Sequence, residues 1–185
     1  MSAPKSDKMV LAGDIGGTKT HLAVFAPGSD VRTPFREETY ASGQYPSLEA
    51  LAREFLAAIE AQIECAGFGV AGPVVAGRAK ITNLPWVMDE AQLAEALGLA
   101  SVHLLNDLEA IAGAVPALRE VDRVVLNRGQ AATGGAVAVI APGTGLGEAF
   151  LVWDGTRYRA QPSEGGHADF APNNALEAGM LNHLQ

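Results

Sequence analysis

The chain has 185 residues, 48% of them hydrophobic and 18% charged, which is enough length and apolar content for a buried core and argues against a disordered protein. Its 13 Lys and Arg residues against 21 Asp and Glu give a net charge of −8, so nucleic acid and anionic membrane surfaces are not expected partners. The polar start Met1–Lys8, the lack of an apolar run of ~20 residues and the single cysteine, Cys65, argue against a signal peptide, a membrane span and an intrachain disulfide, so the cytoplasm is the expected location.

The first part of the chain predicts short strands connected by glycine turns. A strand is expected from Met9 to Asp14, and a Gly16-Gly17 turn leads to a second strand at His21–Phe25 and a third at Phe35–Tyr40. Ser47 is then the expected N-cap of a helix. The apolar face of that helix is expected to consist of Leu48, Leu51, Phe55, Ile59 and Ile63.

From residue 65 onward, predicted strands alternate with helices. A strand at Cys65–Val70 precedes a hairpin centred on Gly77, and a helix follows that is capped by Asp89 and ended by Gly98. The remaining elements expected are strands at Val102–Leu105, Arg123–Leu126, Ala136–Ala141 and Glu148–Trp153, a helix from Leu108 to about Val115, a loop from Pro162 to Pro172 and a helix beginning near Asn173 or Asn174.

This order of elements predicts a mixed sheet of the α/β class, covered by helices, because hairpins come first and strand–helix alternation follows. The pattern changes near Pro116, where a helix stops and an Arg-rich stretch begins. We therefore expect a small α/β domain at residues 1–116 and the beginning of a second domain at residues 117–185.

A glycine-rich segment, Gly13-Asp14-Ile15-Gly16-Gly17-Thr18-Lys19-Thr20, nearly matches the Walker phosphate-loop pattern and fails at Thr18. Strand-like residues follow it, whereas a Walker loop opens a helix. If it binds phosphate, Asp14 requires a cation between the two, which points to Mg²⁺. The alternative is an ordinary hairpin turn.

A second glycine segment, Gly143-Thr144-Gly145-Leu146-Gly147, lies between two predicted strands. It is not a dinucleotide-binding fingerprint, which would need glycine at Glu148 and a helix after it. Two hairpin loops of this kind, each with a threonine, suit a polyphosphate gripped from both sides.

Two further segments carry polar groups in informative places. Asn106 and Asp107 stand between a strand and a helix, where the helix dipole stabilises a carboxylate, although Asp107 as a plain N-cap is the alternative. The loop Ser163–Phe170 places Glu164, His167 and Asp169 around two glycines, an arrangement suited to hydrogen bonds with a hydroxylated ligand. His167 as a plain surface residue is the other possibility.

In this order, the two glycine segments, Leu105-Asn106-Asp107 and Ser163-Glu164-Gly165-Gly166-His167 resemble the bacterial glucokinases of the actin, hexokinase and heat-shock ATPase superfamily. The resemblance implies a ribonuclease-H-like, actin-like ATPase fold with substrates between two domains. It implies phosphorylation of glucose at its 6-hydroxyl, with glucose and MgATP as the partners. It leaves open whether the chain forms a homodimer.

The resemblance also implies roles for single residues. The ATP-binding residues would be Gly13, Asp14, Ile15, Gly16, Gly17, Thr18, Gly143, Thr144 and Gly145. Asp14 would face the Mg²⁺ of MgATP. Asn106, Glu164 and His167 would hydrogen-bond sugar hydroxyls, and Asp107 would bind the sugar and act as the catalytic base.

Two features set this chain apart from the family pattern. With Cys65 as the only cysteine, the Cys-rich zinc motif of the ROK branch is absent, so that branch is not expected. Family members extend beyond the point where this chain stops at Gln185, so an amino-terminal portion of a glucokinase is expected. The alternatives are a non-catalytic sugar-binding fragment and a structural fragment without a ligand.

Overall fold

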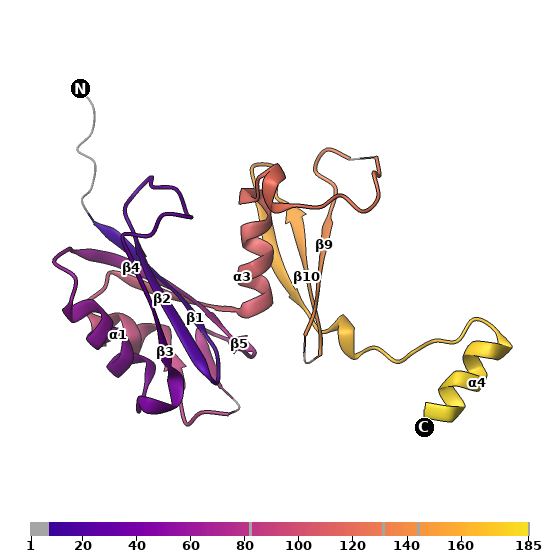
Figure 1. The fold of residues 1–185 in the computed structure, drawn as a ribbon, viewed down its shortest axis with the longest axis horizontal. Helices are drawn as coiled ribbons and strands as arrows, with labels where there is room; N and C mark the ends of the chain where they lie inside the picture. Colours follow the sequence, from indigo (N-terminus) through magenta and orange to yellow (C-terminus); the bar gives the residue numbers. More distant parts are fainter. Residues whose placement is uncertain (1–7, 82, 131, 144, 185) are drawn as a thin grey trace.

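The fold is that of a computed structural model, which describes residues 8–81, 83–130, 132–143 and 145–184. Two larger sheets lie on either side of helix α3 (Asp107–Ala114), as Figure 1 shows. A third, small sheet belongs to a hairpin beside the first one.

The larger sheet has five strands in the order β3-β2-β1-β4-β8. The strands are β1 (Met9–Ile15), β2 (Lys19–Phe25), β3 (Arg36–Ala41), β4 (Ile63–Val70) and β8 (Ser101–Asn106). Antiparallel pairs join β1 to β2 and β2 to β3, and parallel pairs join β1 to β4 and β4 to β8. This confirms the expected mixed sheet of the α/β class.

The register of the parallel strands brings their carboxyl ends to one edge of the sheet. Ile15 is paired with Val70, and Val70 is paired with Asn106. The Gly16-Gly17 turn and Asp107 therefore leave the sheet at the same edge, although they are far apart in the sequence. In open α/β sheets this is the edge where ligands usually bind.

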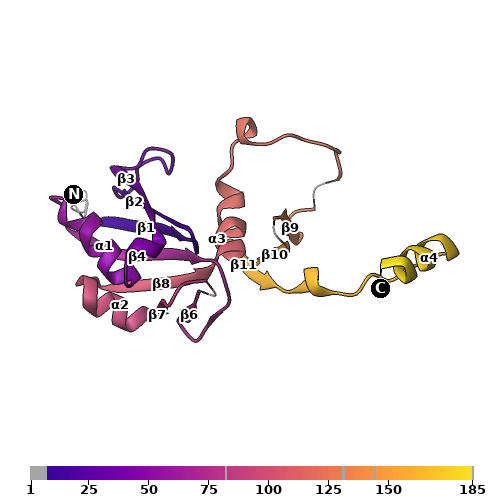
Figure 2. The same cartoon turned by 60° about the horizontal axis from the view of Figure 1, so that its bottom comes forward.

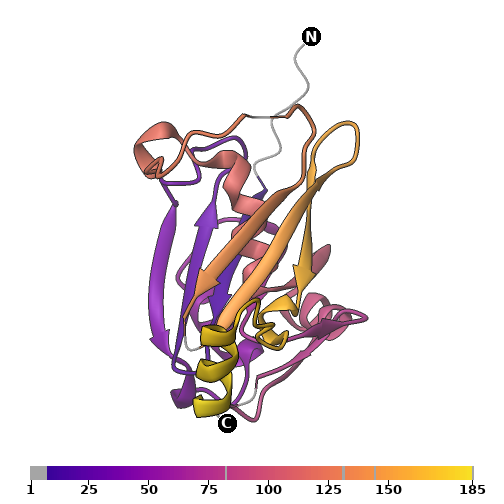
Figure 3. The ribbon, with the colours of Figure 1, turned by 90° about the vertical axis from the view of Figure 1, so that its right-hand side faces the viewer.

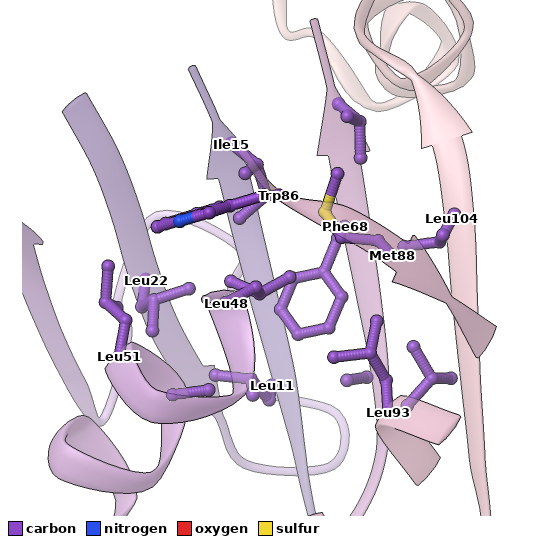
Figure 4. Close-up of a cluster of buried hydrophobic side chains, with 14 of the residues drawn as sticks. Leu11, Ile15, Leu22, Leu48, Leu51, Phe68, Trp86, Met88, Leu93 and Leu104 are labelled. Atoms are coloured by element: carbon purple, nitrogen blue, oxygen red, sulfur yellow. The ribbon is translucent and has the colours of Figure 1, made fainter. Parts of the chain in front are cut away.

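Two helices, α1 (Leu48–Ala57) and α2 (Glu90–Leu97), cover one face of this sheet (Figure 2). Leu48 and Leu51 of α1 pack in one core with side chains from the strands, and Leu93 of α2 joins the same core (Figure 4). The fully buried large side chains include Leu11, Ile15, Leu22, Phe55, Phe68, Trp86 and Met88. Burying one such side chain contributes about 1.5–3 kcal/mol, so this core dominates the stability of the first sheet.

The predicted helix caps are confirmed. The Ser47 side chain accepts from the amide of Ala50, the Asp89 side chain accepts from those of Ala91 and Gln92, and Gly98 adopts the left-handed conformation at the end of α2, with φ +67°. The extent of α1 was predicted wrongly. It ends at Ala57, so Ile59 lies beyond it and Ile63 begins β4. Both side chains still pack against the core, which is why their spacing imitated a helix face.

The small sheet consists of β5 (Val74–Val75), β6 (Arg78–Lys80) and β7 (Val87–Asp89). Its first turn passes through Ala76 and Gly77, both with positive φ, which confirms the predicted hairpin at Gly77. Trp86 precedes β7 and its Nε1 donates to the carbonyl of Tyr45 at 3.1 Å. That bond satisfies the polar atom of an otherwise buried ring.

The second sheet has the order β11-β10-β9 and is antiparallel throughout. Its strands are β9 (Val137–Pro142), β10 (Leu146–Trp153) and β11 (Tyr158–Ser163), and the sequence patterns did not indicate β11. Ala112 of α3 packs with Ala149 and Leu151 in a small core of its own. Because α3 also contacts β4 and β8, this one helix touches both sheets. The domain boundary near residue 116 stays a prediction.

The predicted strand Arg123–Leu126 is wrong. After the 3-10 helices η2 (Val115–Ala117) and η3 (Glu120–Asp122), the chain is irregular up to β9 in the part that the structure describes. Val124 and Leu126 are 85% and 95% exposed. A strand needs a neighbour for its backbone hydrogen bonds, and no described strand pairs with this segment.

Four charged side chains join the loop between β2 and β3 to η3. Arg32 forms an ion pair with Asp122, and its other terminal nitrogen lies 3.7 Å from an Asp30 oxygen. Arg119 lies 3.9 Å from Asp30 and 3.8 Å from Asp122. The loop of the first sheet is thereby linked to the segment that follows α3.

The chain ends with η4 (Gly165–His167), an extended stretch and helix α4 (Ala175–Leu184), which lies away from both larger sheets (Figure 1) and therefore stands in front of them when the molecule is viewed from that end (Figure 3). The helix predicted near Asn173 or Asn174 is confirmed. None of the described helices has the length and apolar content needed to cross a membrane.

Candidate active site

A cavity of about 500 Å³ lies where α3, the β9–β10 hairpin and the η4 segment meet. Residues predicted for three separate site segments line it together: Asn106, Asp107, Gly143, Gly145, Glu164 and His167. The rest of its wall consists of Leu108, Ala141, Leu146, Gly147, Glu148, Ser163 and Gly166. Segments far apart in the sequence are thus gathered around one space.

Asn106 is the N-cap of α3. Its Oδ1 accepts from the amides of Leu108 at 3.0 Å and Glu109 at 3.3 Å, and its Nδ2 donates to the carbonyl of Gly72 at 3.1 Å. The alternative of Asp107 as the N-cap is therefore wrong. Asn106 fixes the start of the helix, and its sugar-binding role stays a prediction.

Asp107 is the first residue of α3 and lines the cavity. One of its oxygens, Oδ1, accepts from the amide of Leu108 at 2.9 Å, so the carboxylate is held against the helix start. Acidic side chains in the first turn of a helix interact favourably with its dipole. Because the cap belongs to Asn106, the carboxylate of Asp107 is left to face a ligand.

The second glycine segment forms the turn between β9 and β10. Pro142 and Leu146 are paired across the turn, and the amide of Gly143 donates to the carbonyl of Gly145 at 2.8 Å. Thr144 lies outside the described residues. Gly143 and Gly145 have no side chain to block the cavity wall, which suits a loop that brings its backbone close to a phosphate.

Glu164 and His167 stand on either side of Gly165 and Gly166. The His167 amide donates to the Glu164 carbonyl at 3.0 Å, and the His167 Nδ1 lies 3.1 Å from the Glu164 Oε2. The His167 and Glu164 side chains are 83% and 82% exposed, so both are accessible to a ligand. A Cβ added at Gly166 would overlap the carbonyl oxygen of Leu146, so this turn packs tightly on the second glycine segment.

The first glycine segment forms the turn between β1 and β2. The Ser42 hydroxyl donates to the carbonyl of Gly16 at 2.8 Å, and the Ser42 amide donates to that of Thr18 at 3.0 Å. Ile15 is fully buried in the core, so only its backbone is available to a nucleotide. A Cβ added at Gly17 would meet the Cβ of Asn83 at 3.4 Å. The turn is therefore held in shape by its neighbours.

Asp14 and Gly13 line a different cavity, of about 520 Å³, on the face of the five-stranded sheet opposite α1. Leu105 and Ala110 also line it, and these residues flank Asn106 and Asp107 in the sequence. The structure thus places the first glycine segment at the same sheet edge as Asp107, but Asp14 does not line the cavity that contains Asp107, Glu164 and His167.

The surroundings of Asp14 suit a magnesium ion that is bound with a nucleotide. Its side chain is exposed, and within the described residues its carboxylate has no hydrogen-bond or ion-pair partner. Protein-bound Mg²⁺ commonly takes one or two carboxylates, with phosphate and water oxygens as its other ligands. Asp14 can provide such a ligand.

Sequence reasoning gave no role in the site to Glu148, Ser163 or Leu108, although Ser163 belongs to a segment that it singled out. Glu148 lies in β10 directly after the second glycine segment and is half-buried in the cavity wall, and Ser163 is its partner on β11. A carboxylate directly after Gly147 was the available signal. The sequence patterns did not show β11, so nothing indicated that Glu148 faces the Glu164–His167 turn.

The architecture is that of the actin-like ATPases, and solved structures that share it are sugar kinases. The glucokinase family model matches residues 11–185. The chain belongs to the glucokinase family.

Individual relatives agree with this assignment. The chain is 43% identical over 180 residues to the glucokinase of Trichormus variabilis, a match that covers 95% of this chain and 52% of the relative. It is similar to the crystal structure of a glucokinase from an Antarctic psychrotroph, with a TM-score of 0.82, 32% identity and coverage of 96% of this chain and 56% of the other. A ROK family glucokinase from Streptomyces griseus, solved with glucose and AMPPNP, shares the fold, with a TM-score of 0.54, 24% identity and coverage of 91% and 53%.

The chain spans about half the length of the curated relatives it matches. The site described above consists only of residues from that half.

Proposed function

We propose that this chain supplies the base, sugar-binding residues and both phosphate loops of a glucokinase, which transfers the γ-phosphoryl group of ATP to the 6-hydroxyl of glucose. The observation that carries the proposal is the cavity in which Asp107 faces Glu164, His167 and the second glycine segment. A carboxylate base, polar groups for hydroxyls and a glycine turn for phosphate are the parts that transfer to a sugar needs. The cytoplasm is the proposed location.

In the proposed reaction, Asp107 accepts the proton of the 6-hydroxyl while the sugar oxygen bonds to the γ-phosphorus. The bond between that phosphorus and the bridging oxygen of ADP breaks, so the products are glucose 6-phosphate, ADP and a proton. Glu164 and His167 orient the sugar through its hydroxyls. Such positioning matters greatly, because a displacement of about 1 Å can cost roughly 100-fold in rate.

The two glycine segments hold the phosphates from opposite sides. Backbone amides at Gly17 and Gly145 are the proposed donors, since no side chain shields them and the neighbouring Gly16 and Gly143 amides already donate to the carbonyls of Lys19 and Gly145. Asp14 holds the Mg²⁺, directly or through water, and the ion neutralises charge on the phosphates when it is bound. The structure of the relative from Streptomyces griseus with glucose and AMPPNP supports this pair of ligands.

A non-catalytic sugar-binding role is the second candidate, favoured by the share of the relatives that this chain covers. Glucose-dependent ADP release separates the two. We would measure it for the 185-residue chain and for the chain extended at Gln185 by the second half of a glucokinase. Turnover by the extended protein supports the kinase. Thermal stabilisation by glucose without ADP release in either protein would leave only sugar binding.

A further inference from the structure

We propose that Glu148 is a positioning residue that holds the Glu164–His167 turn in its sugar-binding shape. The proposed reaction gives no role to this carboxylate, which lies at the junction of the second glycine segment, α3 and η4. The inference rests on the proposed function for its meaning in catalysis. The structural relationship itself is independent of that function.

Glu148 reaches the turn across the β10–β11 pair. It is directly opposite Ser163, the residue before Glu164. A Cβ added at Gly165 would overlap the Glu148 carboxylate, so that carboxylate occupies the space in which any other residue at position 165 would place its side chain. The Ser163 hydroxyl accepts from the Gly165 amide at 3.1 Å, which fixes the same residue from the other side.

The carboxylate of Glu148 is otherwise uncommitted. Among the described residues it has no hydrogen-bond or ion-pair partner, although the side chain is half-buried in the cavity wall. Its contribution is therefore contact with the Gly165 backbone. Gly165 lies between Glu164 and His167, so its position decides where these two side chains stand.

The adjoining residue ties this contact to the rest of the site. A Cβ added at Gly147 would lie 2.8 Å from the Leu108 Cδ2, so the start of β10 is packed against the start of α3 next to Asp107. Glu148 thus connects the Glu164–His167 turn to α3, the helix that begins with the proposed base. Loss of its side chain would leave space beneath Gly165 and let the turn move.

The test uses hydrogen exchange and glucose affinity. Glu148→Ala should speed the amide exchange of residues 164–168 in the 185-residue chain and weaken glucose binding by roughly fivefold to tenfold, the effect of a contact worth about 1 kcal/mol. Glu148→Gln keeps the shape of the side chain and should recover most of this loss. Glu95→Ala, at an exposed position on α2, is the matched control for loss of a glutamate.

Size complementation makes the test specific. Gly165→Ala should disturb the turn because the new methyl group meets the Glu148 carboxylate, and adding Glu148→Ala should restore slow exchange. Gly166→Ala meets the backbone carbonyl of Leu146 instead, so Glu148→Ala should not rescue it. Rescue of the first variant but not the second supports the proposal.

Unchanged exchange at residues 164–168 in Glu148→Ala, or equal rescue of both glycine variants, would overturn it. If the unaltered chain and its extended form show neither glucose binding nor ADP release, the proposed function fails. The exchange measurements still decide the role of Glu148 in that case. Equal loss of affinity in Glu148→Gln and Glu148→Ala would contradict a role in shape.

Discussion

Leu108 packs directly on Gly147, where an added Cβ would lie 2.8 Å from the Leu108 Cδ2 and 2.9 Å from its Cγ. The contact joins the residue after Asp107 to the end of the second glycine segment. It therefore sets the distance between the proposed base and one of the two proposed phosphate loops.

We expect Gly147→Ala to separate these two segments and to lower kcat by roughly 100-fold, the cost of a displacement of about 1 Å. Leu108→Ala in addition should recover part of the rate by making room. Gly113→Ala is the control within α3, because nothing lies within 4 Å of its added Cβ. It should stabilise the protein by about 0.5–1 kcal/mol, as alanine does in a helix. Steady-state kinetics of the extended protein and urea unfolding provide the measurements.

Asp107→Asn should reduce kcat by about 10²–10⁴-fold and preserve glucose binding, since the amide cannot accept the proton. The helix start should survive, because the cap belongs to Asn106. Calorimetric glucose titration accompanies the kinetics. Asn106→Ala, in contrast, should lower the free energy of unfolding by about 1 kcal/mol, because the helix loses its cap. Normal turnover in Asp107→Asn would remove this carboxylate from the mechanism.

Asp14→Ala should weaken MgATP far more than glucose. The side chain is exposed at the sheet edge and does not line the cavity that contains Glu164 and His167. The affinity for glucose should therefore not change when the side chain is removed. The affinity for each ligand is measured on the same variant, at several Mg²⁺ concentrations. Equal losses for the two ligands would mean that Asp14 supports the hairpin instead of the cation.

Asp122 should make stability depend on pH at the acid end. The backbone amide of Arg119 donates to its carboxylate, and together with Arg32 and Arg119 this lowers the pKa of Asp122 below its ordinary value of 3.8. A lowered folded-state pKa stabilises the protein above pH 3.8 and loses that effect as the pH falls through the folded-state value. Asp122→Asn should therefore be less stable than the unaltered chain at pH 7, with a difference that shrinks below pH 3.8.

Urea unfolding at several pH values tests this, and 1 M salt should reduce the difference at pH 7 because the pairs are partly exposed. Asp169→Asn is the control, an exposed carboxylate without a hydrogen-bond partner among the described residues. A difference independent of pH would assign the effect of Asp122 to packing.

The 185-residue chain by itself should show little kinase activity and should associate in solution. Four apolar side chains that lie close together in the sequence are 66–95% exposed: Val121, Val124, Val125 and Leu126. A contiguous exposed apolar surface favours contact with another protein surface. Leu126→Asp should lower the association measured by sizing with light scattering, whereas Glu95→Ala should not. A monomer that turns over glucose at about 1–100 per second would contradict both expectations.

The sequence predicted the mixed sheet, the caps at Ser47, Asp89 and Gly98, and the resemblance that the family match confirms. These features depend on local chemistry, because a cap needs one side-chain oxygen near its own helix and a turn needs glycine at positive φ. The grouping of Asp107, Glu164 and His167 in one cavity agrees with the predicted site, although their roles stay predictions.

The errors have longer-range causes. The apolar spacing of Ile59 and Ile63 continued past the real end of α1, because residues of a following strand can face the same core. Arg123–Leu126 has the residues of a strand but no described neighbour to pair with. The role of Glu148 depends on a cross-strand partner on β11, and no local pattern reveals such a partner.

The order in which the strands appear along the chain has a consequence for synthesis. All five strands of the first sheet precede Asp107, and all three strands of the second sheet follow α3. On a ribosome, the first sheet and its two covering helices can therefore form before the second sheet has been translated. The proposed base at the start of α3 is therefore synthesised before the second glycine segment and the Glu164–His167 turn. The cavity is the last of these features to be completed.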